Sequence, residues 1–182
     1  PEGAVSCGTC LLGSYTTGND PTQRTACTTC PAGSACSGNS VVMQCMAGAF
    51  AAAGSSKCER CGDDSKFSAG NAAACTMCPA GSFTSGNDSF RRTACTACPN
   101  GYSCDGSSAQ TICKEGTYAQ TGYSLCAQCL AGHFQDEQAR ASCKPCLAGT
   151  FANVPGRAAC QKWRTCGLGY GLSVEGSDSS DR

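Results

Sequence analysis

The sequence predicts small disulfide-rich repeats that form an elongated rod of short β-ribbons and turns, with little or no helix and a minimal hydrophobic core. Three observations predict this fold class. The chain has 20 cysteines in 182 residues, its content of large apolar residues is low, and its cysteine pattern recurs with a fixed period. Cysteine contents above about 8–10% are typical of disulfide scaffolds.

The low apolar content makes an ordinary core impossible. Leu, Ile, Val and Phe together number 19, about a tenth of the chain, and a share below about a fifth already signals a missing core. Burying so little apolar surface cannot offset an entropy cost of about 1.5 kcal/mol per ordered residue. A disulfide that closes a loop of about 15 residues contributes about 3 kcal/mol in the chain-entropy model. Because such bonds persist in oxidising compartments, we expect an extracellular or cell-surface location.

Charge argues against a nucleic acid as partner, and hydropathy argues against a direct membrane span. The chain has 13 basic and 13 acidic residues, and no basic run that could neutralise the phosphates of a nucleic acid. The most apolar stretch, Val41 to Gly54, is too short and too interrupted to span a membrane directly. The matching stretch in the next repeat, Ala109 to Gly122, is polar, so we interpret this apolar character as sequence drift.

The start at Pro1, in the middle of the pattern, indicates a piece of a larger protein.

The cysteines repeat with a long, constant period. The segment GNDPTQRTACTTCPAGSAC from Gly18 matches GNDSFRRTACTACPNGYSC from Gly86. The cysteines at positions 7, 10, 27, 30, 36, 45, 58 and 61 recur with one constant offset at positions 75, 78, 95, 98, 104, 113, 126 and 129, and Cys143 and Cys146 continue the series. The period predicts the end of a preceding repeat in residues 1–9, a first repeat in 10–77, a second in 78–145, and a partial, divergent third in 146–182.

A smaller unit lies within this period. It reads Cys, two residues, Gly, one residue, an aromatic residue, a second Gly, and then Cys-x-x-Cys. Pro and Gly after the cysteines favour turns, and the residues between suit two-stranded ribbons. We expect the aromatic ring to cover a neighbouring disulfide. The unit from Cys61 departs, with Asp64 in the glycine position and Phe67 one place late. Units this small have no core of their own, so they should stack end to end.

These motifs carry a family resemblance. Cys78-Pro-Ala-Gly-Ser-Phe83, followed by Gly and Cys-x-x-Cys, resembles ephrin-receptor-like cysteine-rich repeats, which look related to tumour-necrosis-factor-receptor modules. The variant Cys30-Pro-Ala-Gly-Ser-Ala-Cys36 also looks typical of such arrays. Repeats of this kind recur in very large surface proteins of protists. The resemblance implies a receptor ectodomain, a stalk or a surface coat, without choosing between them.

Spacing alone cannot fix the disulfide pairing. The simplest hypothesis joins the second cysteine of one Cys-x-x-Cys to the first of the next, closes the same loop motif elsewhere, and leaves two short hoops. Its pairs are Cys10–Cys27, Cys30–Cys36, Cys45–Cys58, Cys61–Cys75, Cys78–Cys95, Cys98–Cys104, Cys113–Cys126, Cys129–Cys143 and Cys146–Cys160. The interlaced alternative joins Cys30 to Cys45 and Cys36 to Cys58, with an equivalent copy in the next repeat. Under the simple hypothesis Cys7 and Cys166 bond to cysteines beyond this segment.

Two other uses of cysteine are weaker interpretations. Cys7-x-x-Cys10 and Cys27-x-x-Cys30 have zinc-ribbon spacing, but single cysteines such as Cys36 break any division into four-cysteine sites. Redox catalysis would need a thioredoxin-like frame, which the sequence lacks. His133, the only histidine, fills a position that holds varied residues in other units, so we expect it to face solvent. We therefore predict no enzyme, no cofactor and no metal site.

Two sequence features are expected to lie on the surface of the protein. Asn87-Asp88-Ser89 is an N-glycosylation sequon, and its Asn-Asp pair, like that at residues 19 and 20, should stabilise a turn rather than bind calcium. Lys162, Trp163 and Arg164 form the cluster best suited to contact a partner, because Trp and Arg are enriched in interface hot spots. The alternative is that Trp163 packs over an enlarged turn between Cys160 and Cys166.

The function that we predict is a structural or adhesive extracellular segment of a surface rod, stalk, coat or filament, rigidified by disulfides. The alternative is a receptor-type ectodomain that binds a protein ligand. The partners expected are proteins, through self-association or contact with other surface proteins, and glycans as a further class.

Overall fold

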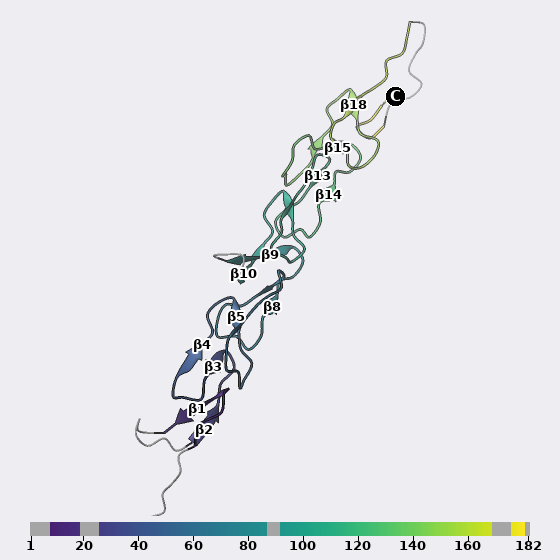
Figure 1. Cartoon of the computed structure of the whole chain (residues 1–182). Coiled ribbons are helices and arrows are strands. Elements are labelled where there is room, and N and C mark those ends of the chain that lie inside the picture. Colours follow the sequence, from purple (N-terminus) through teal and green to yellow (C-terminus); the bar gives the residue numbers. More distant parts are fainter. Residues whose placement is uncertain (1–7, 19–25, 87–91, 169–175, 181–182) are drawn as a thin grey trace, which may run out of the picture. The chain divides into compact units, whose positions relative to one another are not determined.

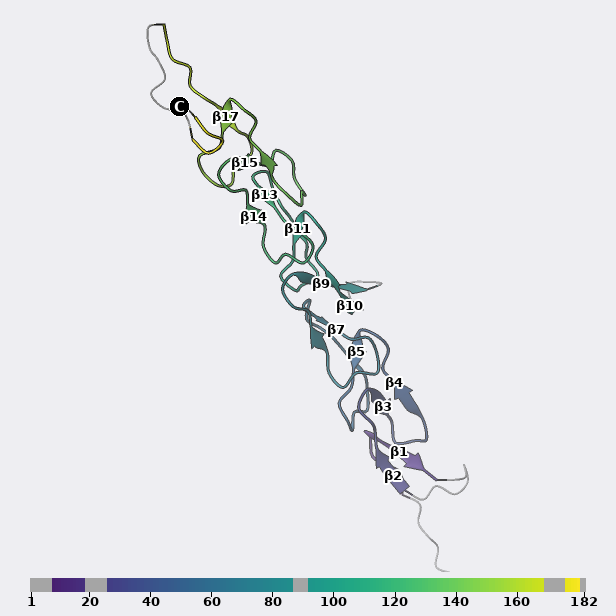
Figure 2. The ribbon, with the colours of Figure 1, turned by 180° about the vertical axis from the view of Figure 1, so that it is seen from behind.

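The computed structural model describes residues 8–18, 26–86, 92–168 and 176–180. Within these ranges the chain forms short strands and no helix, and each strand pairs with one other strand in a two-stranded sheet (Figures 1 and 2). Accordingly, no described helix has the length and apolar character that crossing a membrane requires. The predicted class of short β-ribbons held by disulfides is confirmed.

Strands that are consecutive in the chain pair with each other, from β1 with β2 to β17 with β18. The eight pairs whose register is described are antiparallel. The strands are β1 (Ser14–Thr17), β2 (Ala26–Thr29), β3 (Ser34–Cys36), β4 (Val42–Gln44), β5 (Ala49–Phe50), β6 (Glu59–Arg60), β7 (Lys66–Phe67), β8 (Thr76–Met77), β9 (Ser82–Gly86), β10 (Arg92–Ala97), β11 (Tyr102–Ser103), β12 (Thr111–Ile112), β13 (Thr117–Tyr118), β14 (Ala127–Gln128), β15 (His133–Phe134), β16 (Lys144–Pro145), β17 (Thr150–Phe151) and β18 (Gln161–Lys162).

The chain divides into two compact units. The first comprises Pro1–Cys78 and Thr84–Cys95, and the second comprises Pro79–Phe83 and Thr96–Arg182. Both are built from the same hairpins. The finer repeat boundaries, after residues 9, 77 and 145, stay a prediction.

A tight turn after a cysteine leads into each hairpin. In the turn before β3, the N–H of Ser34 donates to the carbonyl of Pro31 (3.2 Å), and Gly33 has a φ of 80°. Residues with a Cβ rarely adopt this conformation, which is why glycine recurs three places after the cysteine. The strands that follow are only two to six residues long, so they need cross-links to persist.

Nine disulfides connect the described residues, and their pairs are those of the simple hypothesis rather than the interlaced one. The short hoops are Cys30–Cys36 and Cys98–Cys104, each with a sequence separation of 6. The others are Cys10–Cys27, Cys45–Cys58, Cys61–Cys75, Cys78–Cys95, Cys113–Cys126, Cys129–Cys143 and Cys146–Cys160. Cys166 is exposed and has no disulfide partner among the described residues, and Cys7 lies outside them; that both bond to cysteines beyond this segment stays a prediction.

Among the described residues, cysteines and residues that directly follow an aromatic ring make up much of the buried interior. Ala51 and Ala119, which follow Phe50 and Tyr118, are about 1% exposed or less. The two rings themselves are half-buried. That the rings cover disulfides stays a prediction.

Where the position after an aromatic ring holds a polar residue, local hydrogen bonds satisfy it. Gln135 is only 2% exposed. Its amide nitrogen donates to the carbonyl of Ser142 (2.6 Å), and its amide oxygen accepts from the N–H of Glu137 (3.1 Å). Burying this amide without partners would cost about 1–3 kcal/mol.

Backbone hydrogen bonds link successive hairpins within each compact unit. In the first, the N–H of Gly33, which precedes β3, donates to the carbonyl of Ala51, which follows β5 (2.7 Å), whereas the carbonyl of Gly33 accepts from Cys45 (2.9 Å) within its own hairpin. In the second, Gly101 donates to Ala119 (2.8 Å) and accepts from Cys113 (2.9 Å), at the equivalent positions of the next period. The recurring glycine therefore supplies both the turn and the link to the next hairpin.

Candidate functional site

The hairpin β7–β8 departs from the common plan, as the sequence indicated at Asp64. The N–H of Cys78 donates to the carbonyl of Ser65 (2.8 Å), just as that of Cys61 donates to Gly48 (3.0 Å). Ser65, rather than Asp64, therefore holds the usual position of the glycine. One extra residue is inserted before the strand, which explains why Phe67 comes one place late.

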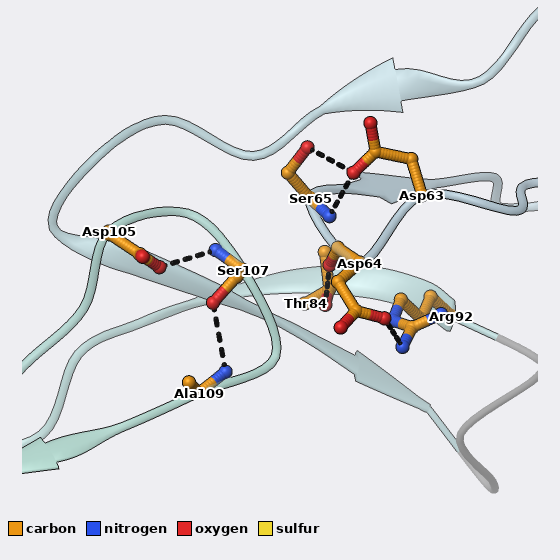
Figure 3. A network of polar contacts seen from close by, with 8 residues as sticks. All are labelled: Asp63, Asp64, Ser65, Thr84, Arg92, Asp105, Ser107 and Ala109. Atoms are coloured by element: carbon orange, nitrogen blue, oxygen red, sulfur yellow. Dashed lines mark hydrogen bonds and ion pairs between the residues drawn. The ribbon is translucent and has the colours of Figure 1, made fainter.

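The extra residue changes how this turn is bonded (Figure 3). One carboxylate oxygen of Asp63 accepts from the backbone N–H of Ser65 (2.9 Å) and from its hydroxyl (2.7 Å). The backbone hydrogen bond from Ser65, followed by that from its hydroxyl, lowers the pKa of Asp63 from its ordinary value. The hydroxyl of Thr84 donates to the carbonyl of Asp64 (2.6 Å). Side chains thus replace part of the usual backbone link to the following hairpin.

The carboxylate of Asp64 forms an ion pair with the guanidinium group of Arg92 (Figure 3). The side chain of Arg92 is only 10% exposed, whereas that of Asp64 is 65% exposed. The Nε atom of Arg92 is buried without a hydrogen-bond partner. The carbonyl of Arg92 accepts from the N–H of Ser68 (3.1 Å), so the arginine joins this unit through main chain and side chain. These contacts of Asp64 and Ser68 therefore join the hairpin β7–β8 to Arg92 at the start of β10, which is a structural role.

A related polar turn precedes β12. The carboxylate of Asp105 accepts from the N–H of Ser107 (2.9 Å), and the hydroxyl of Ser107 accepts from the N–H of Ala109 (3.1 Å; Figure 3). Hydrogen bonds from the side chain and backbone of Ser107 lower the pKa of Asp105. At the equivalent place in the first repeat, the amide oxygen of Asn39 accepts from the N–H of Val41 (2.9 Å). The two turns have the same hydrogen-bonding pattern. In each turn the polar side chains accept hydrogen bonds from the backbone of the same turn.

The predicted contact cluster lies at and just after β18. Lys162 pairs with Thr150 in the register of β17 and β18. Lys162 and Arg164 are exposed, and Trp163 is half-buried. The indole N–H of Trp163 donates to the carbonyl of Ser177 (3.0 Å). Trp163 therefore contacts a later segment of its own chain; that it packs over the turn between Cys160 and Cys166 stays a prediction.

Residues 176–180 complete the last hairpin. The carbonyl of Asp178 accepts from the N–H of Ala152 (2.8 Å). In the preceding hairpin, Gln135 donates in the same way to Arg157 (3.1 Å). The segment after Trp163 therefore supplies an acceptor that elsewhere comes from a later hairpin. The sequence did not predict this role, because the segment after Cys166 resembles the start of a further unit and no motif connects Asp178 to Ala152.

The other positions that the sequence singled out lie partly within the described residues and partly outside them. His133 lies in β15 and is half-buried, so it faces solvent only in part. Its Nδ1 lies 3.5 Å from the carbonyl of Ala131, because the turn folds back beside the strand. Asn87 and the Asn-Asp pair at residues 19 and 20 lie outside the described residues. In the described part of the chain no three His, Cys, Asp or Glu side chains gather where they could hold a metal ion.

An apolar hollow lies beside β4, β5 and β6. It has a volume of about 190 Å³ and an open mouth, and Met43, Met46, Ala49 and Arg60 are among the residues that line it. Met43 and Met46 are 56% and 69% exposed. The apolar character of this stretch was interpreted as sequence drift, because periodicity does not reveal which exposed side chains surround a cavity.

Comparison with known families gives one match. Residues 116–162 match the family described as tyrosine-protein kinase ephrin type A/B receptor-like. This segment is an ephrin-receptor-like repeat. No curated protein matches the chain.

The ephrin-receptor-like segment contains the hairpins β13–β14, β15–β16 and β17–β18. The resemblance read from the cysteine motifs is therefore confirmed in residues 116–162. Disulfide-rich repeats of this type are typical of extracellular segments.

Proposed function

We propose that this chain is a structural or adhesive segment of a surface rod, stalk, coat or filament outside the cell, and not an enzyme. The observation that carries the proposal is that cross-links and backbone links recur together. The disulfide Cys45–Cys58 and the backbone bond from Gly33 to Ala51 return as Cys113–Cys126 and the bond from Gly101 to Ala119. Repetition of both supports a role that depends on regular spacing.

The disulfides also support mechanical rigidity. Each closes a loop with a sequence separation of 6 to 17 residues, so a pulling force cannot extend those loops unless a covalent bond breaks. Each hairpin is then tied to the next by main-chain hydrogen bonds, which do not depend on side-chain identity. Such a segment resists extension and proteolysis without needing a hydrophobic core.

The partners that fit this role are further copies of the chain, other surface proteins and glycans. A receptor-type ectodomain that binds a protein ligand is the alternative. The observation that favours it is the exposure of Lys162 and Arg164 beside Trp163, since Arg and Trp are common in binding hot spots.

Small-angle X-ray scattering of the oxidised chain tests the scaffold. A globular domain of 182 residues has a radius of gyration of about 16 Å. We expect a clearly larger value, with the cross-section of a rod and little change between low and high salt. Surface labelling of intact cells with an impermeant reagent provides the second measurement. A globular radius, or labelling that requires permeabilised cells, would contradict the proposal.

A further inference from the structure

The hairpin β7–β8 is attached to the hairpin β9–β10 differently from the way in which other successive hairpins are attached. Elsewhere a glycine N–H donates to a backbone carbonyl of the next hairpin, as that of Gly48 donates to Ser68 (2.8 Å). At the equivalent place, the N–H of Ser65 donates instead to the carboxylate of Asp63 in its own turn (2.9 Å). The residue inserted in this turn therefore directs one backbone donor inward, away from the next hairpin.

Side chains supply contacts in place of that link. The hydroxyl of Thr84 donates to the carbonyl of Asp64 (2.6 Å), and the guanidinium group of Arg92 pairs with the Asp64 carboxylate. Both donors belong to buried residues. One backbone link of the common kind remains, from the N–H of Ser68 to the carbonyl of Arg92 (3.1 Å). The attachment therefore depends on which side chains are present, and all of these residues belong to the first compact unit.

The two hairpins can separate without breaking a disulfide. Each is closed by a disulfide of its own, Cys61–Cys75 in the first and Cys78–Cys95 in the second. None of the disulfides between described residues joins one hairpin to the other. Separation therefore breaks only hydrogen bonds and the ion pair. Local openings of this kind require less free energy than global unfolding.

The ion pair makes this attachment sensitive to salt. The side chain of Asp64 is 65% exposed, so dissolved ions reach its carboxylate. The screening length for charges falls from about 10 Å in 0.1 M salt to about 3 Å in 1 M salt, and exposed ion pairs weaken accordingly. Hydrogen bonds between neutral backbone groups, such as that from Gly48 to Ser68, lack this dependence.

We propose that the contact of Asp64 with Arg92 is an ionic joint, at which β9–β10 separates from β7–β8 and rejoins it as ionic strength changes, while the disulfides stay closed. This inference goes beyond the rigid role proposed above, because it assigns one place at which successive hairpins come apart reversibly. It does not rest on that role, since it concerns contacts within one compact unit.

Hydrogen exchange of the oxidised full chain, read by NMR in low and high salt, tests the joint. The amide of Ser68, which donates to Arg92, reports on the joint. The amide of Ala51 is the internal control, because it donates to Ala72 (3.0 Å) at the equivalent place of the preceding hairpin. We expect exchange at Ser68, relative to Ala51, to be about threefold faster in about 1 M than in about 0.05 M sodium chloride.

Variants of this turn separate the joint from ordinary fraying. Asp64→Asn should give fast exchange at Ser68 in both salt concentrations, because the charge is gone. Asp63→Asn, the same change at the adjacent carboxylate, should keep the salt dependence. Deleting Asp64 together with Ser65→Gly restores the common spacing, with glycine three places and the aromatic residue five places after Cys61. This rebuilt variant should form the missing glycine link and lose the salt dependence.

Three outcomes would overturn the proposal. They are an equal effect of salt on Ser68 and Ala51, a salt response at Ser68 that persists in Asp64→Asn, and one that persists in the rebuilt variant. Non-reducing peptide mapping shows whether the rebuilt variant has kept its disulfides. If it has not, the comparison of Asp64→Asn with Asp63→Asn decides alone.

Discussion

The backbone N–H of Trp163 donates to the carbonyl of Gly149 (3.0 Å), just as that of Cys146 donates to Gly132 (2.8 Å). Trp163 therefore occupies the place that the second cysteine of a Cys-x-x-Cys has in the other units. In those units a disulfide leaves from this place, whereas here an indole N–H donates to Ser177 (3.0 Å). A hydrogen-bonded ring replaces a covalent link.

Replacing this ring should loosen the segment that it contacts. In Trp163→Ala the hydrogen bond to Ser177 is lost, and with it part of the support for Asp178, whose carbonyl accepts from Ala152. One such bond contributes about 0.5–1.5 kcal/mol, so the amide of Ala152 should exchange with solvent severalfold faster. Hydrogen exchange read by NMR measures this. Lys162→Ala, which changes an exposed neighbour, serves as control. Equal exchange in both variants would show that the ring does not hold the segment.

Non-reducing peptide mapping should recover the nine disulfides. The decisive peptides are those that contain Cys30 and Cys45, since the interlaced alternative joins these two and the structure pairs them with Cys36 and Cys58. Cys166 is exposed and has no disulfide partner among the described residues, so the peptide that contains it should separate from the peptides that these nine disulfides join. A bond within one Cys-x-x-Cys, or between Cys30 and Cys45, would refute the pairing.

Two glycines with similar backbone conformations should respond differently to substitution. Gly116 and Gly149 have φ values of 79° and 86°. A Cβ on Gly116 would lie 2.1 Å from the carbonyl oxygen of Gly156, whereas one on Gly149 would meet nothing within 4 Å. Gly149→Ala should therefore cost only the strain of a positive φ, about 1 kcal/mol. Gly116→Ala should cost clearly more and displace the turn at Gly156, which thermal unfolding and amide exchange would report. Equal costs would contradict the close approach.

Removing the carboxylate of Asp64 should destabilise the junction at β7. Asp64→Ala leaves the guanidinium group of Arg92, which is 10% exposed, without its anion. Leaving a buried donor unpaired costs about 1–3 kcal/mol, and the exposure of Asp64 puts the expected loss at the lower end, about 1 kcal/mol. The amide of Ser68, which donates to Arg92, reports the effect by hydrogen exchange. Lys57→Ala breaks an exposed contact with Glu59 at 4.0 Å and should change little. A similar loss in both variants would argue against a special role for Arg92.

Charged groups around β15 and β16 should make that hairpin sensitive to pH at both extremes. The Lys144 ammonium donates to Asp136 (2.6 Å) and Glu137 (3.2 Å). The hydrogen bond from Lys144 lowers the pKa of Asp136, and hydrogen bonds from Arg140 and then Lys144 lower that of Glu137. The bond to Asp136, followed by that to Glu137, raises the pKa of Lys144.

The signs of these shifts define the pH window. The carboxylates stabilise the fold above their unfolded pKa, about 4, and this contribution is lost as pH falls through their lowered folded pKa. The lysine stabilises it below its unfolded pKa, about 10.4, and this contribution is lost as pH rises through its raised folded pKa. Lys144→Met should flatten both limbs of a pH titration of hairpin stability, followed by amide exchange, whereas Lys162→Met should not. A titration unchanged by Lys144→Met would refute the assignment.

The features that the sequence could predict are those that depend on residues close together in the chain. The turns after the cysteines depend on Pro and Gly close together, as at Pro31 and Gly33, so the hairpins and short cross-links follow from nearby residues. The insertion before Ser65 was visible as a late aromatic at Phe67. The ion pair between Asp64 and Arg92 was not, because the two residues are far apart in the sequence and no motif connects them.

Other features escaped for physical reasons as well. Trp163 keeps the two-residue spacing after Cys160, and this spacing could have identified it as a substitute for cysteine. The next cysteine, Cys166, made the turn look enlarged instead. The Met43 and Met46 hollow depends on which side chains share one face of a short hairpin. That arrangement becomes visible only when the strand register is known.

The uneven burial of the sulfur atoms has a consequence for how the chain comes apart. Cys27 is exposed, whereas both cysteines of the hoop Cys30–Cys36 are at most 1% exposed, as are those of Cys98–Cys104. Thiol–disulfide exchange requires a thiolate to reach a sulfur atom. A reductant therefore attacks the outer links first and meets the two hoops last. Loss of structure in a reducing environment would therefore begin at the disulfides that close individual hairpins, such as Cys10–Cys27, and would leave the two short hoops until last.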